Sequence, residues 1–146
     1  MTHRIALLVC LLAALPVRAS GQYFGQNKVQ YERLRFQVLA TPNFDIYHYP
    51  EEADAVRLAA RLVEQWRASL TTTLGFGLPG RQPLVLYASH PHFTQTQIVG
   101  GRIGEGTGGV TESLKRRMAL PFAASLGETS HVLGHELVHA FQYAAG

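Results

Sequence analysis

The sequence predicts an α+β domain built on a mixed β-sheet. Residues 33–40 and 44–49 alternate apolar and polar side chains with a period of two, which is typical of strands. Residues 52–73 and 126–145 instead repeat apolar side chains every three or four positions, which is typical of helices. No internal repeat or linker separates these segments. We therefore expect one domain with the order strand, strand, helix, strand, loop, strand, strand, helix.

Residues 1–19 have the features of a secretory signal peptide. A short basic start is followed by the apolar run IALLVCLLAALPV and by a V-x-A sequence that ends at Ala19. The run is too short for a transmembrane helix, and an uncleaved N-terminal anchor is the alternative. Cys10 is the only cysteine, and Val9 before it disfavours lipidation. We expect a secreted, periplasmic or cell-envelope protein.

Cleavage after Ala19 would change both the charge and the possible metal ligands. It removes Arg4 and Arg18, two of the 13 basic residues, and leaves 11 basic against 10 acidic residues. The net charge falls from +3 to +1, which does not indicate a nucleic-acid partner. Because the only cysteine is also removed, a metal ion would have to be held by His, Asp or Glu.

After a polar lead-in segment, the first elements of residues 20–146 read as a hairpin and a helix. The turn signal TPN between the two alternating segments predicts a β-hairpin. Pro50 and two following acidic residues suit the first turn of a helix, which we expect to end near Gly75. The apolar run PLVLYAS at 83–89 predicts a central strand.

A glycine-rich loop and two short strands should precede the last helix. The loop at 99–109 contains GEGTGG, which fits G-x-G-x-x-G, but it neither follows a clear strand nor opens a helix, so we expect no nucleotide site. A mobile loop beside a cleft is the better interpretation. Residues 110–122 read as two strands around Lys115 and Arg116. Thr129 or Ser130 is expected to cap the last helix.

The last helix carries the motif HELVH at 135–139. Four residues of an α-helix turn about 400° and rise about 6 Å, so His135 and His139 lie on one face and can reach one ion. Glu136 lies about 100° from His135, where it could take a proton from a zinc-activated water. The apolar residues of the helix share the opposite side: Leu133, Leu137, Ala140, Phe141 and Ala144. The sequence thus predicts a Zn²⁺ site.

Other interpretations of the histidines remain open. A surface helix that happens to carry two histidines and a glutamate is the simplest alternative. His131 lies two turns from His139, about 12 Å along the axis, so one ion cannot take both; we expect a capping role or one behind the ligands. His90 and His92 flank a proline and belong either to an exposed turn or to the rim of the cleft.

Four segments of the chain together resemble the gluzincin metallopeptidases of the peptidase MA clan, in particular secreted bacterial peptidase-MA-like domains. These segments are HVLGHELVHAFQY, PLVLYASHPHF, GEGTGGVTESLKRRMALPF and QYFGQNKVQYERLRFQVLATPNFDIYHYP. The resemblance covers nearly all of residues 20–146. It implies a thermolysin-like N-terminal subdomain with a mixed sheet, whose edge strand lines a cleft above the zinc helix. It also implies that His135 and His139 are zinc ligands, that Glu136 is the general base, and that the substrate is a peptide or protein.

The resemblance is incomplete at the third zinc ligand. A gluzincin takes this ligand, a Glu, from a later helix, whereas the upstream acids Glu105, Glu112 and Glu128 could serve only as substitutes. We therefore expect an N-terminal piece of a larger enzyme, inactive by itself and continued by C-terminal domains. Without those domains we expect Phe141 and Tyr143 to be partly exposed.

The substrate cleft should lie along the strand that begins at Val110. That strand could present its edge to an extended peptide, so that Gly108, Gly109, Val110 and Thr111 line the cleft. The competing interpretation is a secreted, non-enzymatic module that binds peptides or proteins with the same cleft.

Overall fold

The computed structural model describes residues 33–146. Its elements are β1 (Gln37–Ala40), β2 (Phe44–His48), a 3₁₀ turn (Pro50–Glu52), α2 (Ala53–Leu74), β3 (Gln82–Tyr87), α3 (His90–Phe93), β4 (Val110–Thr111), β5 (Met118–Pro121) and α4 (Leu126–Ala145). The expected signal peptide and lead-in segment lie outside the described residues. Within residues 33–146, no helix is long and apolar enough to cross a membrane.

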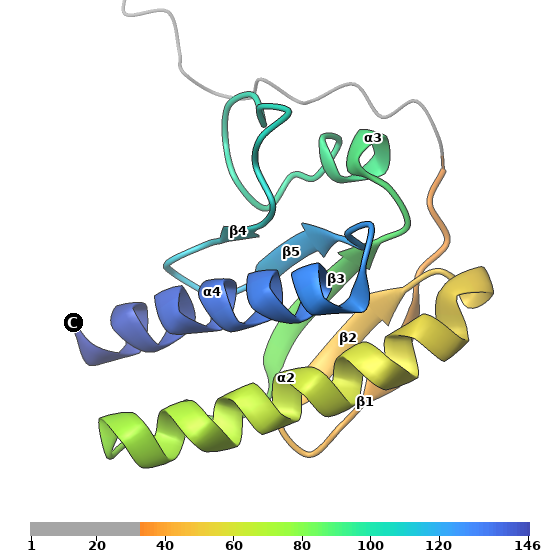
Figure 1. Ribbon diagram of the computed structural model, residues 1–146. Coiled ribbons are helices and arrows are strands. Elements are labelled where there is room, and N and C mark those ends of the chain that lie inside the picture. The colour runs from red at the N-terminus through yellow and green to blue at the C-terminus, as the bar shows by residue number, and fades with distance from the viewer. Residues whose placement is uncertain (1–32) are drawn as a thin grey trace, which may run out of the picture.

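The five strands form one mixed sheet in the order β1-β2-β3-β5-β4. β1 and β2 make the expected antiparallel hairpin, β3 is parallel to both β2 and β5, and β4 returns antiparallel to β5 at the edge. α2 and α4 lie side by side over one face of the sheet, whereas α3 lies away from them, next to β3 and β5 (Figure 1). The α+β class with a mixed sheet and a central β3 is therefore confirmed.

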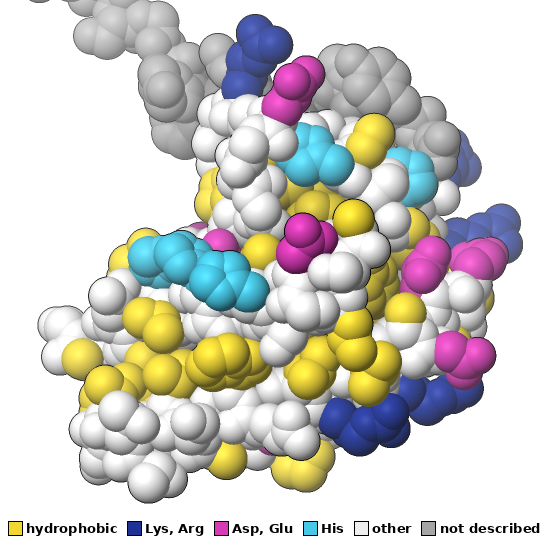
Figure 2. All heavy atoms as spheres, in the orientation of Figure 1, with side chains coloured by type: hydrophobic (Ala, Val, Ile, Leu, Met, Phe, Trp, Pro, Cys, Tyr) yellow, Lys and Arg dark blue, Asp and Glu magenta, His cyan; other side chains and the backbone are white. Residues whose placement is uncertain are grey.

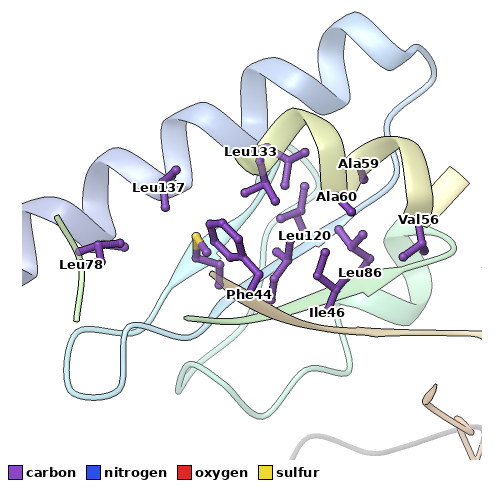
Figure 3. Packing of buried hydrophobic residues seen from close by; sticks show 14 of the residues in the cluster. Phe44, Ile46, Val56, Ala59, Ala60, Leu78, Leu86, Leu120, Leu133 and Leu137 are labelled. Atoms are coloured by element: carbon purple, nitrogen blue, oxygen red, sulfur yellow. The ribbon is translucent and has the colours of Figure 1, made fainter. Parts of the chain in front are cut away.

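The main core fills the space between the sheet and the two long helices. Alternate residues of the strands point toward the helices, and the apolar stripes of α2 and α4 point back toward the sheet (Figure 3). The members include Phe44, Ile46, Leu84, Leu86, Met118, Leu120, Val56, Val63, Leu133 and Leu137, all buried. Each buried side chain of this size stabilises the fold by roughly 1.5–3 kcal/mol, so this core fixes where α4 lies on the sheet.

A smaller cluster on the other face explains why β1 is shorter than expected. Strand pairing begins only at Gln37. Before it, Leu34 packs against the buried cluster formed by Tyr49, Tyr87, Phe93 and Ala119, and the ring of Phe36 lies 5.1 Å from that of Tyr49. Side-chain packing therefore replaces strand pairing over residues 33–36.

The helix ends are set by local hydrogen bonding. α2 ends as expected, since Gly75 adopts the left-handed conformation (φ 77°) and its N–H bonds Thr71 O at 3.0 Å. The prediction that Thr129 or Ser130 caps α4 is wrong. Ser125 caps α4: its hydroxyl accepts from the N–H of Glu128, whose carboxylate accepts from the N–H of Ser125, both at 3.1 Å.

Phe141 is buried, contrary to expectation, with 1% of its surface exposed. The loop after α2 folds back over it: the ring of Phe76 lies 5.5 Å from that of Phe141, and Leu78 joins the same core. Tyr143 is 44% exposed, as expected. The loop after α2 therefore covers one of the two apolar side chains.

Gly134, directly before the first histidine of the motif, lies against Trp66 of α2. A Cβ on Gly134 would lie 2.7 Å from Trp66 Cε2, which is closer than side-chain carbons pack. The indole N–H of Trp66 also donates to Ser130 Oγ at 3.1 Å. This contact seats the indole of Trp66, which is 37% exposed, across the backbone of α4.

The β-hairpin is tied to α2 by one carboxylate. Thr41 Oγ1 donates to Glu64 Oε1 at 2.6 Å, Asn43 N donates to the same oxygen at 2.9 Å, and Asn43 Nδ2 donates to Oε2 at 2.6 Å. Burial raises the pKa of Glu64, but these hydrogen bonds and the charge of Arg67 outweigh it and hold the pKa below the usual 4.5.

We expect Glu64→Gln to lower the free energy of unfolding by roughly 1–2 kcal/mol at pH 7. Because the folded-state pKa is lowered, the carboxylate stabilises the fold above the unfolded pKa, and this contribution is lost as pH falls through the folded pKa. Urea titrations of both proteins between pH 7 and pH 3 would measure the difference, which should shrink toward acid. If the difference in free energy of unfolding stayed constant over this pH range, the ionised carboxylate of Glu64 would not be what ties the hairpin to α2.

Candidate metal centre

The two histidines of the motif converge on one point beside α4. His135 Nε2 and His139 Nε2 lie 3.1 Å apart, and their rings are nearly perpendicular, at 84°. With Zn–N bonds of about 2.0–2.1 Å, this separation corresponds to an N–Zn–N angle of about 100°, close to tetrahedral. Histidine side chains stand on the outer face of α4 in Figure 2. The pair fits one zinc ion.

Gln142 orients the second histidine. His139 Nδ1 lies 2.9 Å from Gln142 Oε1, so the ring can donate its Nδ1–H to the amide oxygen. In this tautomer the lone pair of His139 Nε2 can accept the hydrogen bond from His135 Nε2–H at 3.1 Å or bind a metal, as in many metal-bound histidines. Gln142 was not among the residues predicted from the sequence, although its position three residues after His139 places both side chains on one helix face.

The carboxylate of Glu136 is buried and held by the edge strand. Only 4% of the residue is exposed. The Thr111 hydroxyl donates to Glu136 Oε2 at 2.6 Å and lies 3.0 Å from the main-chain oxygen of the same residue. A Cβ on Gly109 would lie 2.8 Å from Glu136 Cγ and 2.9 Å from Oε1. The carboxylate thus rests on the backbone of Gly109, in space that any larger residue would fill.

A small cavity of about 260 Å³ opens at this junction between α4 and the segment before β4. Its lining comprises Gly108, Gly109, His131, Val132, His135 and Glu136. Two of the four expected cleft residues, Gly108 and Gly109, therefore line it together with motif residues. Val110 turns to the opposite side and packs against the smaller cluster, and Thr111 contacts Glu136 directly.

The described residues do not supply a third ligand. Within residues 33–146, no group of three or more His, Cys, Asp or Glu side chains is placed to hold a metal ion. Of the upstream acids, Glu112 forms an ion pair with Arg117 at 2.8 Å, Glu128 belongs to the cap of α4, and Glu105 is exposed in the glycine-rich loop. Two imidazoles are thus the metal ligands that this part of the chain offers.

The remaining histidines lie in different surroundings. His131 is exposed and lines the cavity. His90 and His92 do not form an exposed turn but belong to α3, where the hydroxyl of Ser89 accepts from His92 N. Their rings pack against Phe93 and Tyr49, at 5.8 and 5.6 Å, and neither residue lines the cavity beside Glu136.

Comparison of this chain with protein-family models, with curated proteins and with solved structures finds no match.

Proposed function

We propose that this chain carries the zinc-binding helix and the general base of a metallopeptidase. One observation carries the proposal: the Nε2 atoms of His135 and His139 converge at 3.1 Å, beside a buried carboxylate held by the edge strand. Glu136 is buried and lines one cavity with His135, and a buried carboxylate is costly for a purely structural helix. A general base in zinc-assisted hydrolysis has to lie near the metal ligands, and the cavity that Glu136 shares with His135 supports this role.

In this proposal each residue has a separate task. A zinc ion bound to His135 and His139 would supply Lewis acidity, which makes water a nucleophile at neutral pH. Glu136 would take a proton from the attacking water as the water oxygen adds to the peptide carbonyl carbon, and would pass this proton to the leaving nitrogen as the C–N bond breaks. Thr111 holds Oε2, which leaves Oε1 of Glu136 for the proton.

The first test is zinc binding. We expect the full-length protein to bind one zinc ion and expect His135→Ala and His139→Ala to weaken binding at least tenfold each, since each removes a ligand. Isothermal titration calorimetry and metal analysis would measure this. His131→Ala is the matched control on the same helix and should retain zinc. Equal affinity in all four proteins would refute the site.

The second candidate is a non-enzymatic module that binds peptides. Two features of residues 33–146 favour it: they supply no third metal ligand, and β4 is the edge strand of their sheet. Peptide binding that needs neither zinc nor His135 and His139, without any hydrolysis, would support this module over the enzyme.

A further inference from the structure

The backbone groups of β4 point in two directions. In an antiparallel ladder, the two residues of a hydrogen-bonded pair exchange both of their bonds, and the groups of the next pair point outward. Glu112 N donates to Arg117 O at 2.9 Å, and this pair continues the register of Val110 with Ala119 and Thr111 with Met118. Val110 therefore bonds to β5, whereas Thr111 turns its N–H and C=O toward the other side of β4, the free edge, where no further strand lies among residues 33–146.

Thr111 consequently connects the free edge of β4 to the carboxylate of Glu136. Its main chain faces away from β5, and its side chain contacts Glu136 Oε2 at 2.6 Å. Gly109 lies two residues before Thr111 and therefore faces the same side of the chain, and the carboxylate of Glu136 rests against it. A strand added to the edge would thus bond to the backbone of the residue that holds the carboxylate.

β4 is also short. It has two residues, and only the turn that follows is tightened, by the ion pair between Arg117 and Glu112. The preceding segment is the glycine-rich loop. Strand pairs this short are marginal, so an additional pairing partner would fix the position of Thr111 more firmly than β5 does alone.

We propose that an extended peptide paired with the free edge of β4 aligns Glu136 through Thr111. The inference rests on the proposed function and assigns to Thr111 the role of a positioning residue, which acts through the carboxylate of Glu136. A short peptide that leaves the edge empty would leave Glu136 less well fixed. Peptide length should therefore change kcat, and not only KM, because alignment of the base acts in the transition state.

The kinetic test uses peptides that share one scissile dipeptide and grow by one residue at a time. With the zinc-loaded full-length protein, we expect kcat to rise roughly tenfold or more once the peptide spans β4. Thr111→Val removes the hydroxyl but keeps the strand and should abolish this rise, whereas Thr111→Ser should restore it. Thr107→Val in the preceding loop is the matched control and should behave as wild type. Zinc content should be equal in all four proteins.

A second test needs neither zinc nor turnover. Hydrogen exchange of the wild-type protein, measured by NMR with and without a non-cleavable extended peptide, reports the two amides of β4 separately. The Thr111 N–H should exchange rapidly in the free protein and become protected on binding. The Val110 N–H, bonded to β5, should be protected in both states.

The outcomes separate the two proposals. If wild type hydrolyses no peptide of any length, the proposed function fails. If it hydrolyses peptides but kcat does not change with length, or if Thr111→Val keeps the length dependence, the coupling through Thr111 is overturned while the proposed function stands. Unchanged exchange at Thr111 with the peptide bound would likewise overturn the pairing.

Discussion

Glu136→Gln is expected to slow peptide hydrolysis on the order of 10²–10⁴-fold while leaving zinc binding unchanged. The amide has the shape of the carboxylate, and its oxygen can still accept the hydrogen bond from Thr111, but it cannot take a proton from water. General-base catalysis typically contributes a factor of this size. Steady-state kinetics at saturating substrate, together with metal analysis of the same samples, would measure both effects.

The control for this variant is Glu128→Gln. Glu128 lies in the first turn of α4 and bonds only to Ser125 in the cap, so its replacement should lower stability slightly and leave kcat unchanged. Full activity of Glu136→Gln would remove the base from the mechanism. Loss of zinc from this variant would instead mean that Glu136 is needed for the fold of the site.

Gly109→Ala should have the second largest effect, although residue 109 offers no side chain to chemistry. The new methyl group would overlap the Glu136 side chain, with Cδ at 3.0 Å and Cγ and Oε1 closer still. The carboxylate must shift, and a misplacement of about 1 Å can cost about 10²-fold in rate. The φ of Gly109 is not positive, so an alanine is compatible with the backbone there.

Gly106→Ala provides the matched control for Gly109→Ala. It lies in the same loop, and a Cβ there meets nothing within 4 Å. We expect kcat/KM to fall about 10²-fold for Gly109→Ala and to remain at the wild-type value for Gly106→Ala, with equal zinc content in both. Equal rates in both variants would show that Glu136 tolerates displacement, contrary to the role assigned to it.

The elements that local sequence controls were predictable. The hairpin around TPN, the end of α2 at Gly75 and the start of α4 depend on turn and helix-end residues within a few positions. The predicted cap of α4 was wrong because Ser125, Thr129 and Ser130 can all cap a helix and lie within six positions, and the reciprocal bonds between Ser125 and Glu128 select Ser125. α3 was missed because four residues of HPHF carry no periodic signal.

The long-range contacts were not predictable. Burial of Phe141 depends on Phe76, 65 residues earlier in the chain, and on the path of the loop after α2. The hydrogen bond from Thr111 to Glu136 requires the observed register of β4 on β5, because a shift of one residue would turn the Thr111 side chain away from α4. The spacing of His135 and His139 gave their shared face, since helix geometry alone determines it.

The contact between Gly134 and Trp66 has a consequence for how this chain can vary through evolution. The ring occupies the volume that any side chain at 134 would need, so the two positions share one fixed space. Relatives with alanine or serine at 134 should carry a smaller residue at 66, and a bulky ring at 66 should occur only opposite glycine. Paired substitution at positions 66 and 134 would therefore identify homologues in which α4, the helix of His135 and His139, packs against α2 in the same way.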